Sequence, residues 1–157
     1  MANLYLIAEF LVVTLAAGIF GTGLMTLVMT WITRSGFAHV DMIEAIGSLF
    51  TKTTENARLI GGLLHFIAGV VFAMIYTFII NLVGATGLPG SVLVGTLLGA
   101  FQGFVMSFLL VIWVAENHPV ERYRNAGFRV AVSHFIGHLV FGFTVGLVVS
   151  GFGFTIV

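Results

Sequence analysis

The chain lacks cysteine and carries very little charge. None of its 157 residues is a cysteine, which excludes disulfides, thiolate metal sites and cysteine nucleophiles. Charged residues make up only 8% of the sequence, whereas an ordinary soluble domain has about 25%. Six Lys and Arg balance six Asp and Glu, so no basic patch for a nucleic acid is expected.

Apolar side chains take the place of the missing charge. They account for 59% of the residues, and the mean hydropathy is +1.15. A water-soluble core of 157 residues cannot hide that much apolar surface, so the composition indicates an integral membrane protein. The N-terminal stretch MANLYLIAEFLVV has no Lys or Arg and therefore lacks the charged start of a secretory signal. We expect it to begin a retained helix.

Four apolar segments are long enough to cross a bilayer, which takes roughly 20 residues of helix. They cover residues 6–33, 59–82, 91–115 and 128–150. The sequence therefore predicts one all-α transmembrane domain over residues 1–157, built as a four-helix bundle.

The connections between these segments differ in charge. All six Lys and Arg lie within residues 34–58 and 116–129, whereas the connection VGATGLPG at 83–90 is an uncharged turn. Lys and Arg near membrane spans accumulate on the cytoplasmic side. We therefore expect loops 34–58 and 116–128 in the cytoplasm, both termini outside, and a location in a prokaryotic inner membrane.

The first charged loop contains its own helix signal. In DMIEAIGSLF, Asp41 stands where an N-cap is expected and Glu44 three residues later, as in a capping box. The apolar residues that follow share one helical face, which predicts a short interfacial helix at 41–50. A metal or proton site made of His39, Asp41 and Glu44 is the alternative, but capping already accounts for both carboxylates.

The two halves of the chain resemble each other. HFIAGVVFA (65–73) and HFIGHLVFG (134–142) align without a gap and are identical at five of nine positions. We therefore expect two tandem helical hairpins that run in the same direction and are related by an axis along the membrane normal.

Glycines recur at steps of four along the predicted spans. Small residues at this spacing let helices approach closely in lipid. The sequence leaves open whether they pack inside the bundle or against another subunit. These glycines are Gly61 and Gly69, Gly95, Gly99 and Gly103, and Gly142 and Gly146.

Three histidines lie inside the predicted spans at similar depth. His65, His134 and His138 follow the nearest loop arginine by five to nine residues, which places them roughly 8–14 Å into their helices. Met25 and Met29 reach a comparable depth on the first span. Polar side chains within a membrane are functional hypotheses by default.

Three interpretations of this layer stay open. His65 with His134 or His138 could be the axial ligands of haem b, held between facing helices. Imidazole together with the thioethers of Met25 and Met29 could instead bind copper, because both suit Cu(I). The third interpretation has no cofactor: the histidines hydrogen-bond across the bundle to Ser, Thr, Tyr or Gln.

The stretches MTLVM (25–29), HFIAG (65–69) and GHLVFG (137–142) resemble a family of small four-helix bacterial and archaeal membrane proteins. The resemblance implies a four-helix membrane fold. No established activity comes with that family, so it implies no role for His65 or His138.

The sequence contains no nucleophile with a base and no phosphate-binding motif, which favours a non-enzymatic role. We expect an integral membrane subunit of a larger respiratory, photosynthetic or transport complex, with lipid and other membrane subunits or further copies of itself as partners. Electron transfer through haem b or copper is the first alternative. A small transporter or proton path through Glu9, Gln102 and the histidines is the second.

Overall fold

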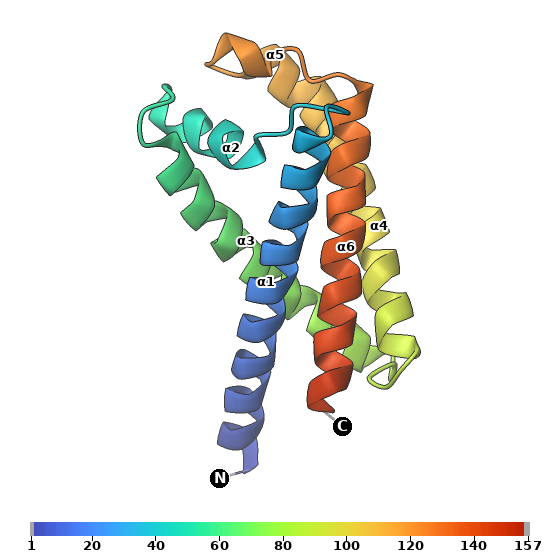
Figure 1. The fold of residues 1–157 in the computed structure, drawn as a ribbon. Coiled ribbons are helices and arrows are strands. Elements are labelled where there is room, and N and C mark those ends of the chain that lie inside the picture. Colours follow the sequence, from blue (N-terminus) through green and yellow to red (C-terminus); the bar gives the residue numbers. More distant parts are fainter. Residues whose placement is uncertain (1, 156–157) are drawn as a thin grey trace.

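The computed structural model describes residues 2–155, and all regular structure within them is helical (Figure 1). A π-helical turn, Leu110–Val114, continues α4, and a 3-10 turn, Glu121–Tyr123, precedes α6. The helices are α1 (Ala2–Arg34), α2 (Met42–Thr51), α3 (Ala57–Leu82), α4 (Gly90–Leu109), α5 (Ala115–Asn117) and α6 (Phe128–Phe152).

Four of these helices are long and apolar enough to cross a membrane: α1, α3, α6 and the continuous stretch Gly90–Asn117 that contains α4. Their outward surfaces are covered with exposed Leu, Ile, Val and Phe side chains, which only lipid can accommodate at this density. The protein is therefore an integral membrane protein in contact with the bilayer. The predicted all-α fold with four spans is confirmed, and the observed helices overlap the predicted segments closely.

The four spans do not form a closed bundle, because not every pair of neighbouring spans is packed together. α6 lies between α1 and α4, and α3 crosses α1 diagonally (Figure 1). α2 lies against the first turns of α3. α4 and α6 share the most extensive interface, whereas α3 and α4 barely touch. The bundle is consequently open along the α3–α4 seam. The predicted tandem repeat would relate α1 to α4 and α3 to α6. The α1–α6 interface is tightly packed and the corresponding α3–α4 interface is not, so the repeat stays a prediction.

Both termini lie at one end of the bundle, and α2 and α5 lie at the other (Figure 1). We name the latter the α2 end. Each Lys and Arg belongs to a helix end or loop at this end: Arg34, Lys52, Arg58, Arg122, Arg124 and Arg129.

The glycine ridge of α4 packs inside the chain. A Cβ on Gly95 would overlap the carbonyl oxygen of Gly142, and a Cβ on Gly99 would overlap that of His138. On α6, a Cβ on Gly146 would overlap the carbonyl oxygen of Ser91. Backbone against backbone is the closest approach two helices can make. The structure thus answers the question that the sequence left open, since this ridge joins α4 to α6 rather than to another subunit.

The other predicted packing glycines also lie at contacts within the chain. A Cβ on Gly61 of α3 would overlap the carbonyl oxygen of Ile43 in α2, and a Cβ on Gly69 would overlap the hydroxyl oxygen of Thr22 in α1. Gly103 faces α6, where an added Cβ would lie 3.0 Å from the Cβ of His138. α3 is therefore fixed by glycine contacts to α2 on one side and α1 on the other.

Candidate functional site

A cavity of about 500 Å³ lies in the half of the bundle nearest α2. Its walls come from α1, α2, α3 and α6, and from α4 with the π-helical turn. π-helical turns within α-helices occur frequently at functional sites, and this one contributes Leu110, Trp113 and Val114 to the wall. The cavity exists because α3 and α4 diverge instead of packing together.

The cavity opens sideways, toward the bilayer. Three of the residues that line it are also exposed: Ala68 on α3, Met106 on α4 and Trp113 in the π-helical turn. These residues stand on the two helices that border the open seam. A molecule dissolved in the membrane could therefore enter without crossing water.

α2 closes the cavity at its loop end. Met42, Ile46, Leu49 and Phe50, which form the apolar face of this helix, line the cavity. The predicted short helix is confirmed as Met42–Thr51. Its apolar face serves as a roof for the cavity, a contact that the sequence did not predict.

The polar groups of the cavity wall are few, and none is a charged residue. Among the described residues that line it there is no Asp, Glu, Lys or Arg. Its polar side chains belong to Thr22, His65, Gln102, His134 and His138. The three predicted histidines therefore do come together, on the wall of one cavity.

Each imidazole keeps a buried ring nitrogen without a partner. These atoms are Nε2 of His65, Nε2 of His134 and Nδ1 of His138. The hydroxyl oxygen of Thr22, beside them on the wall, is likewise buried and unpaired. Buried polar atoms normally have a hydrogen-bond partner because leaving one unpaired costs about 1–3 kcal/mol. Several such atoms at one cavity indicate a site shaped for a bound molecule.

The predicted hydrogen bonds from the histidines across the bundle are not found in the described residues. His134 bonds through Nδ1 to the Val130 carbonyl oxygen of its own helix, at 2.9 Å. The polar groups expected as partners bind elsewhere: the Tyr76 hydroxyl donates to Oε1 of Gln102 at 2.6 Å and so joins α3 to α4. Ser133 donates to the carbonyl oxygen of Arg129 on its own helix. Packing alone thus leaves the imidazoles unsatisfied.

The two methionines differ in position. Met25 lines the cavity, whereas Met29 does not. A Cβ on Gly137 would lie 3.2 Å from the Met29 sulfur and 3.1 Å from Cε of Met25, so both pack α1 against α6. Within residues 2–155, no three His, Asp or Glu side chains form a group that could hold a metal ion. Glu9 is exposed on α1 and does not line the cavity.

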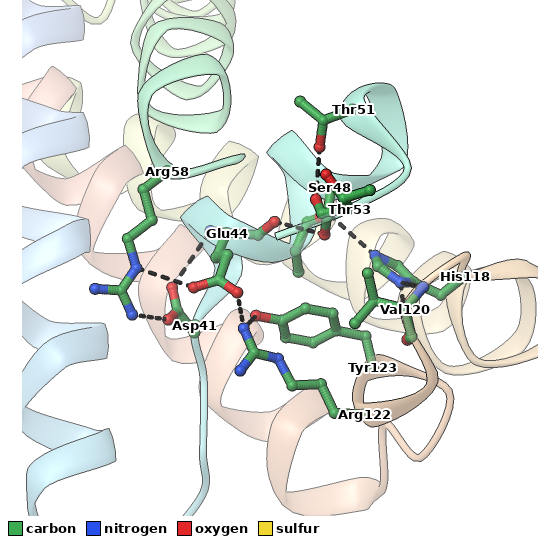
Figure 2. A network of polar contacts seen from close by, with 11 residues as sticks. Asp41, Glu44, Ser48, Thr51, Thr53, Arg58, His118, Val120, Arg122 and Tyr123 are labelled. Carbon is green, nitrogen blue, oxygen red and sulfur yellow. Dashed lines mark hydrogen bonds and ion pairs between the residues drawn. The ribbon is translucent and has the colours of Figure 1, made fainter. Parts of the chain in front are cut away.

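A charged cluster at the α2 end holds the roof in place (Figure 2). Asp41 caps α2 by accepting from the Glu44 backbone N–H at 3.3 Å, as predicted. The Glu44 side chain is buried and pairs with two arginines, Arg58 at 3.0 Å and Arg122. Arg58 also reaches Asp41 at 2.9 Å. Glu44 therefore connects both charged loops rather than completing a capping box.

His118 forms a second connection between the loops. Its ring is fully buried, and Nε2 lies 3.0 Å from the carbonyl oxygen of Ala45 in α2 (Figure 2). The Tyr123 ring packs edge-on against it at 4.8 Å. Burial, together with the nearby Asp41 carboxylate, raises the pKa of Tyr123 above its usual value. No motif around His118 predicts this contact, because its partner is a backbone carbonyl oxygen far away in the sequence.

Replacing Glu44 by glutamine is expected to lower the free energy of unfolding by about 2 kcal/mol, because two charge-assisted contacts to arginine are lost. Chemical unfolding in detergent measures the change. Glu116→Gln is the control, since Glu116 is exposed. Equal stability of the two variants would show that the cluster does not hold the loops together.

Comparison with family models, with curated proteins and with solved structures found no match to this chain. The fold itself defines the class: a small integral membrane protein with four spans. The family resemblance of MTLVM, HFIAG and GHLVFG stays a prediction.

Proposed function

We propose that this protein is a non-enzymatic membrane subunit that binds a lipid-soluble molecule in the cavity between α3 and α4. One observation carries the proposal: an apolar cavity that opens to lipid contains three imidazoles with unpaired buried nitrogens. Apolar pockets with a few converging polar groups are the usual form of small-molecule sites. The apolar wall supplies affinity, and the imidazoles fix the orientation of the bound molecule.

The positive-inside rule supports an orientation with the α2 end in the cytoplasm, because every Lys and Arg lies there. We propose a prokaryotic cytoplasmic membrane as its location, with both termini outside. Membership of a larger complex no longer rests on the glycine ridge, which packs α4 on α6. It rests on the small loops, which leave little of the chain outside the bilayer for an independent activity.

Haem b is the second candidate occupant, supported by the unpaired Nε2 atoms of His65 and His134. Two such nitrogens are the axial donors that a haem iron takes from histidine. The lack of any Lys or Arg on the wall speaks against it, because haem b carries two negatively charged propionates. A Soret band in the purified protein would favour haem over an uncharged molecule. The proton path has less support, since Glu9 stands apart from the cavity.

Filling the cavity tests the proposal. We expect gently solubilised protein to retain a lipid-soluble molecule, detected by mass spectrometry of a solvent extract. In Ala68→Phe its occupancy should fall at least tenfold, since the new ring occupies the mouth of the cavity. Ile67→Phe is the matched control, because the neighbouring Ile67 is exposed and does not line the cavity. The proposal fails if no molecule is enriched in the unmodified protein, or if both variants lose it equally.

A further inference from the structure

The hydrogen bond of His134 determines what its other nitrogen can do. A carbonyl oxygen only accepts, so Nδ1 of His134 must carry the hydrogen that it donates to Val130. In a neutral imidazole the other nitrogen, Nε2, then holds a lone pair and can only accept. Among the described residues, no carboxylate lines the cavity to balance a charged ring. His134 therefore holds a buried hydrogen-bond acceptor in the wall of the cavity.

This acceptor is buried, and no donor from the described residues 2–155 bonds to it. The His134 side chain is 5% exposed, lines the cavity, and its Nε2 has no partner. A molecule that brings only acceptors, such as an ether or an ester, would leave this nitrogen unpaired at a cost of about 1–3 kcal/mol. A molecule that brings a hydroxyl satisfies it. The site should therefore select for a hydrogen-bond donor.

The rest of the wall restricts the molecule further. Without Lys or Arg on the wall, nothing balances a carboxylate or a phosphate. Aromatic side chains from four different elements face the cavity, which suits a flat ring; they are Phe50, Phe72, Trp113 and Phe141. The opening at the α3–α4 seam leaves room for an apolar tail to extend into the bilayer.

We infer that the bound molecule is a lipid-soluble compound with a ring hydroxyl, such as a phenol or a quinol, whose hydroxyl donates to Nε2 of His134. This inference rests on the proposed function and names the chemical class that the site accepts. His65 and His138 can each donate or accept, because within the described part of the chain no hydrogen bond fixes the hydrogen on either ring. They are placed to bind a second oxygen on the same ring.

The test compares para-decylphenol with its methyl ether, in which a methyl group replaces the hydrogen that His134 would accept. Binding is followed through the emission of Trp113, which lines the cavity. A Trp31→Phe background removes the other of the two tryptophans. We expect the phenol to bind at least tenfold more tightly than the ether, as loss of one buried hydrogen bond predicts. In His134→Phe the ratio of the affinities for phenol and ether should fall to near one, whereas in Ile67→Phe this ratio should not change.

The outcomes separate this inference from the proposed function. Equal affinity for phenol and ether in the unmodified protein, with both lost in Ala68→Phe, would overturn the inference and leave the cavity as a binding site. A phenol preference that survives in His134→Phe would overturn the assignment to His134. Binding of neither probe, with no molecule retained on purification, would overturn the proposed function as well. The comparison of phenol with ether in the Trp31→Phe background needs no substitution at His134, so misfolding of His134→Phe does not block the test.

Discussion

Replacing Gly142 by alanine should destabilise the protein by about 3 kcal/mol, the upper range for inserting a methyl group into a packed core. The new Cβ would overlap the carbonyl oxygen of Gly95 and lie 3.0 Å from Cα of Gly99. Both neighbours are backbone atoms of α4, so no side chain can turn away. α4 and α6 would have to separate along their most extensive interface. We expect a large loss of monodisperse protein after solubilisation.

Gly151→Ala is the matched control for this change. Gly151 lies in the same helix, and a Cβ there would meet no atom within 4 Å. Alanine also favours helix by up to about 1 kcal/mol over glycine, so this variant should be as stable as the parent or more so. Thermal unfolding in detergent and size-exclusion chromatography measure both effects. If Gly142→Ala unfolds at the same temperature as Gly151→Ala, the close α4–α6 contact is not important for stability.

Replacing Gly61 by alanine should detach α2 from α3 while the four spans stay folded. A Cβ on Gly61 would overlap the Ile43 carbonyl oxygen and lie 2.8 Å from the Gly47 nitrogen. α2 would then move away from the cavity, and the amount of molecule retained on purification should fall at least tenfold. Gly62→Ala is the control, since its nearest neighbour would be Cγ2 of Ile43 at 3.9 Å.

The absence of cysteine makes the movement of α2 measurable. A single Ile46→Cys substitution places a thiol on the face of α2 that lines the cavity. We expect a thiol reagent to label it at least ten times faster in Gly61→Ala than in Gly62→Ala. Unchanged labelling would mean that the charged cluster around Glu44 holds α2 without help from the glycine contact.

The two glycine predictions address separate parts of the molecule. The α4–α6 contact holds the spans together, and the α2–α3 contact closes the cavity that the spans leave open. Loss of the bound molecule without loss of the bundle, in Gly61→Ala, would show that α2 controls access to the site. The same loss in Glu44→Gln would show that the charged cluster also holds α2 over the cavity.

Much of the fold could be predicted because lipid constrains sequence strongly. A span needs about 20 apolar residues, and each of the four is visible as a long apolar run; two of the three loops between them hold all the Lys and Arg. The cap at Asp41 was equally visible, because an N-cap is a local interaction within three residues. The glycine steps predicted close packing for the same reason, since their spacing follows from helix geometry alone.

The site could be predicted only in part. The sequence placed His65, His134 and His138 at one depth, and the structure shows them on one cavity wall. It did not show that the α3–α4 seam is open, because this depends on how helices far apart in the chain cross. It also missed the contact of Glu44 with Arg122 and that of His118 with Ala45, each of which joins the two charged loops. Such contacts have no periodicity from which they could be inferred.

The sequence by itself determined that this protein is an integral membrane protein, how many times the chain crosses the bilayer, and which residues lie at the depth of the cavity. Composition, helix length and spacing are properties of neighbouring residues, so they can be read along the chain. Only the tertiary structure decided that the glycine ridge faces inward, that α2 covers a cavity, and that His134 presents an acceptor. Each of these depends on which surfaces meet, and the packing of distant segments settles that.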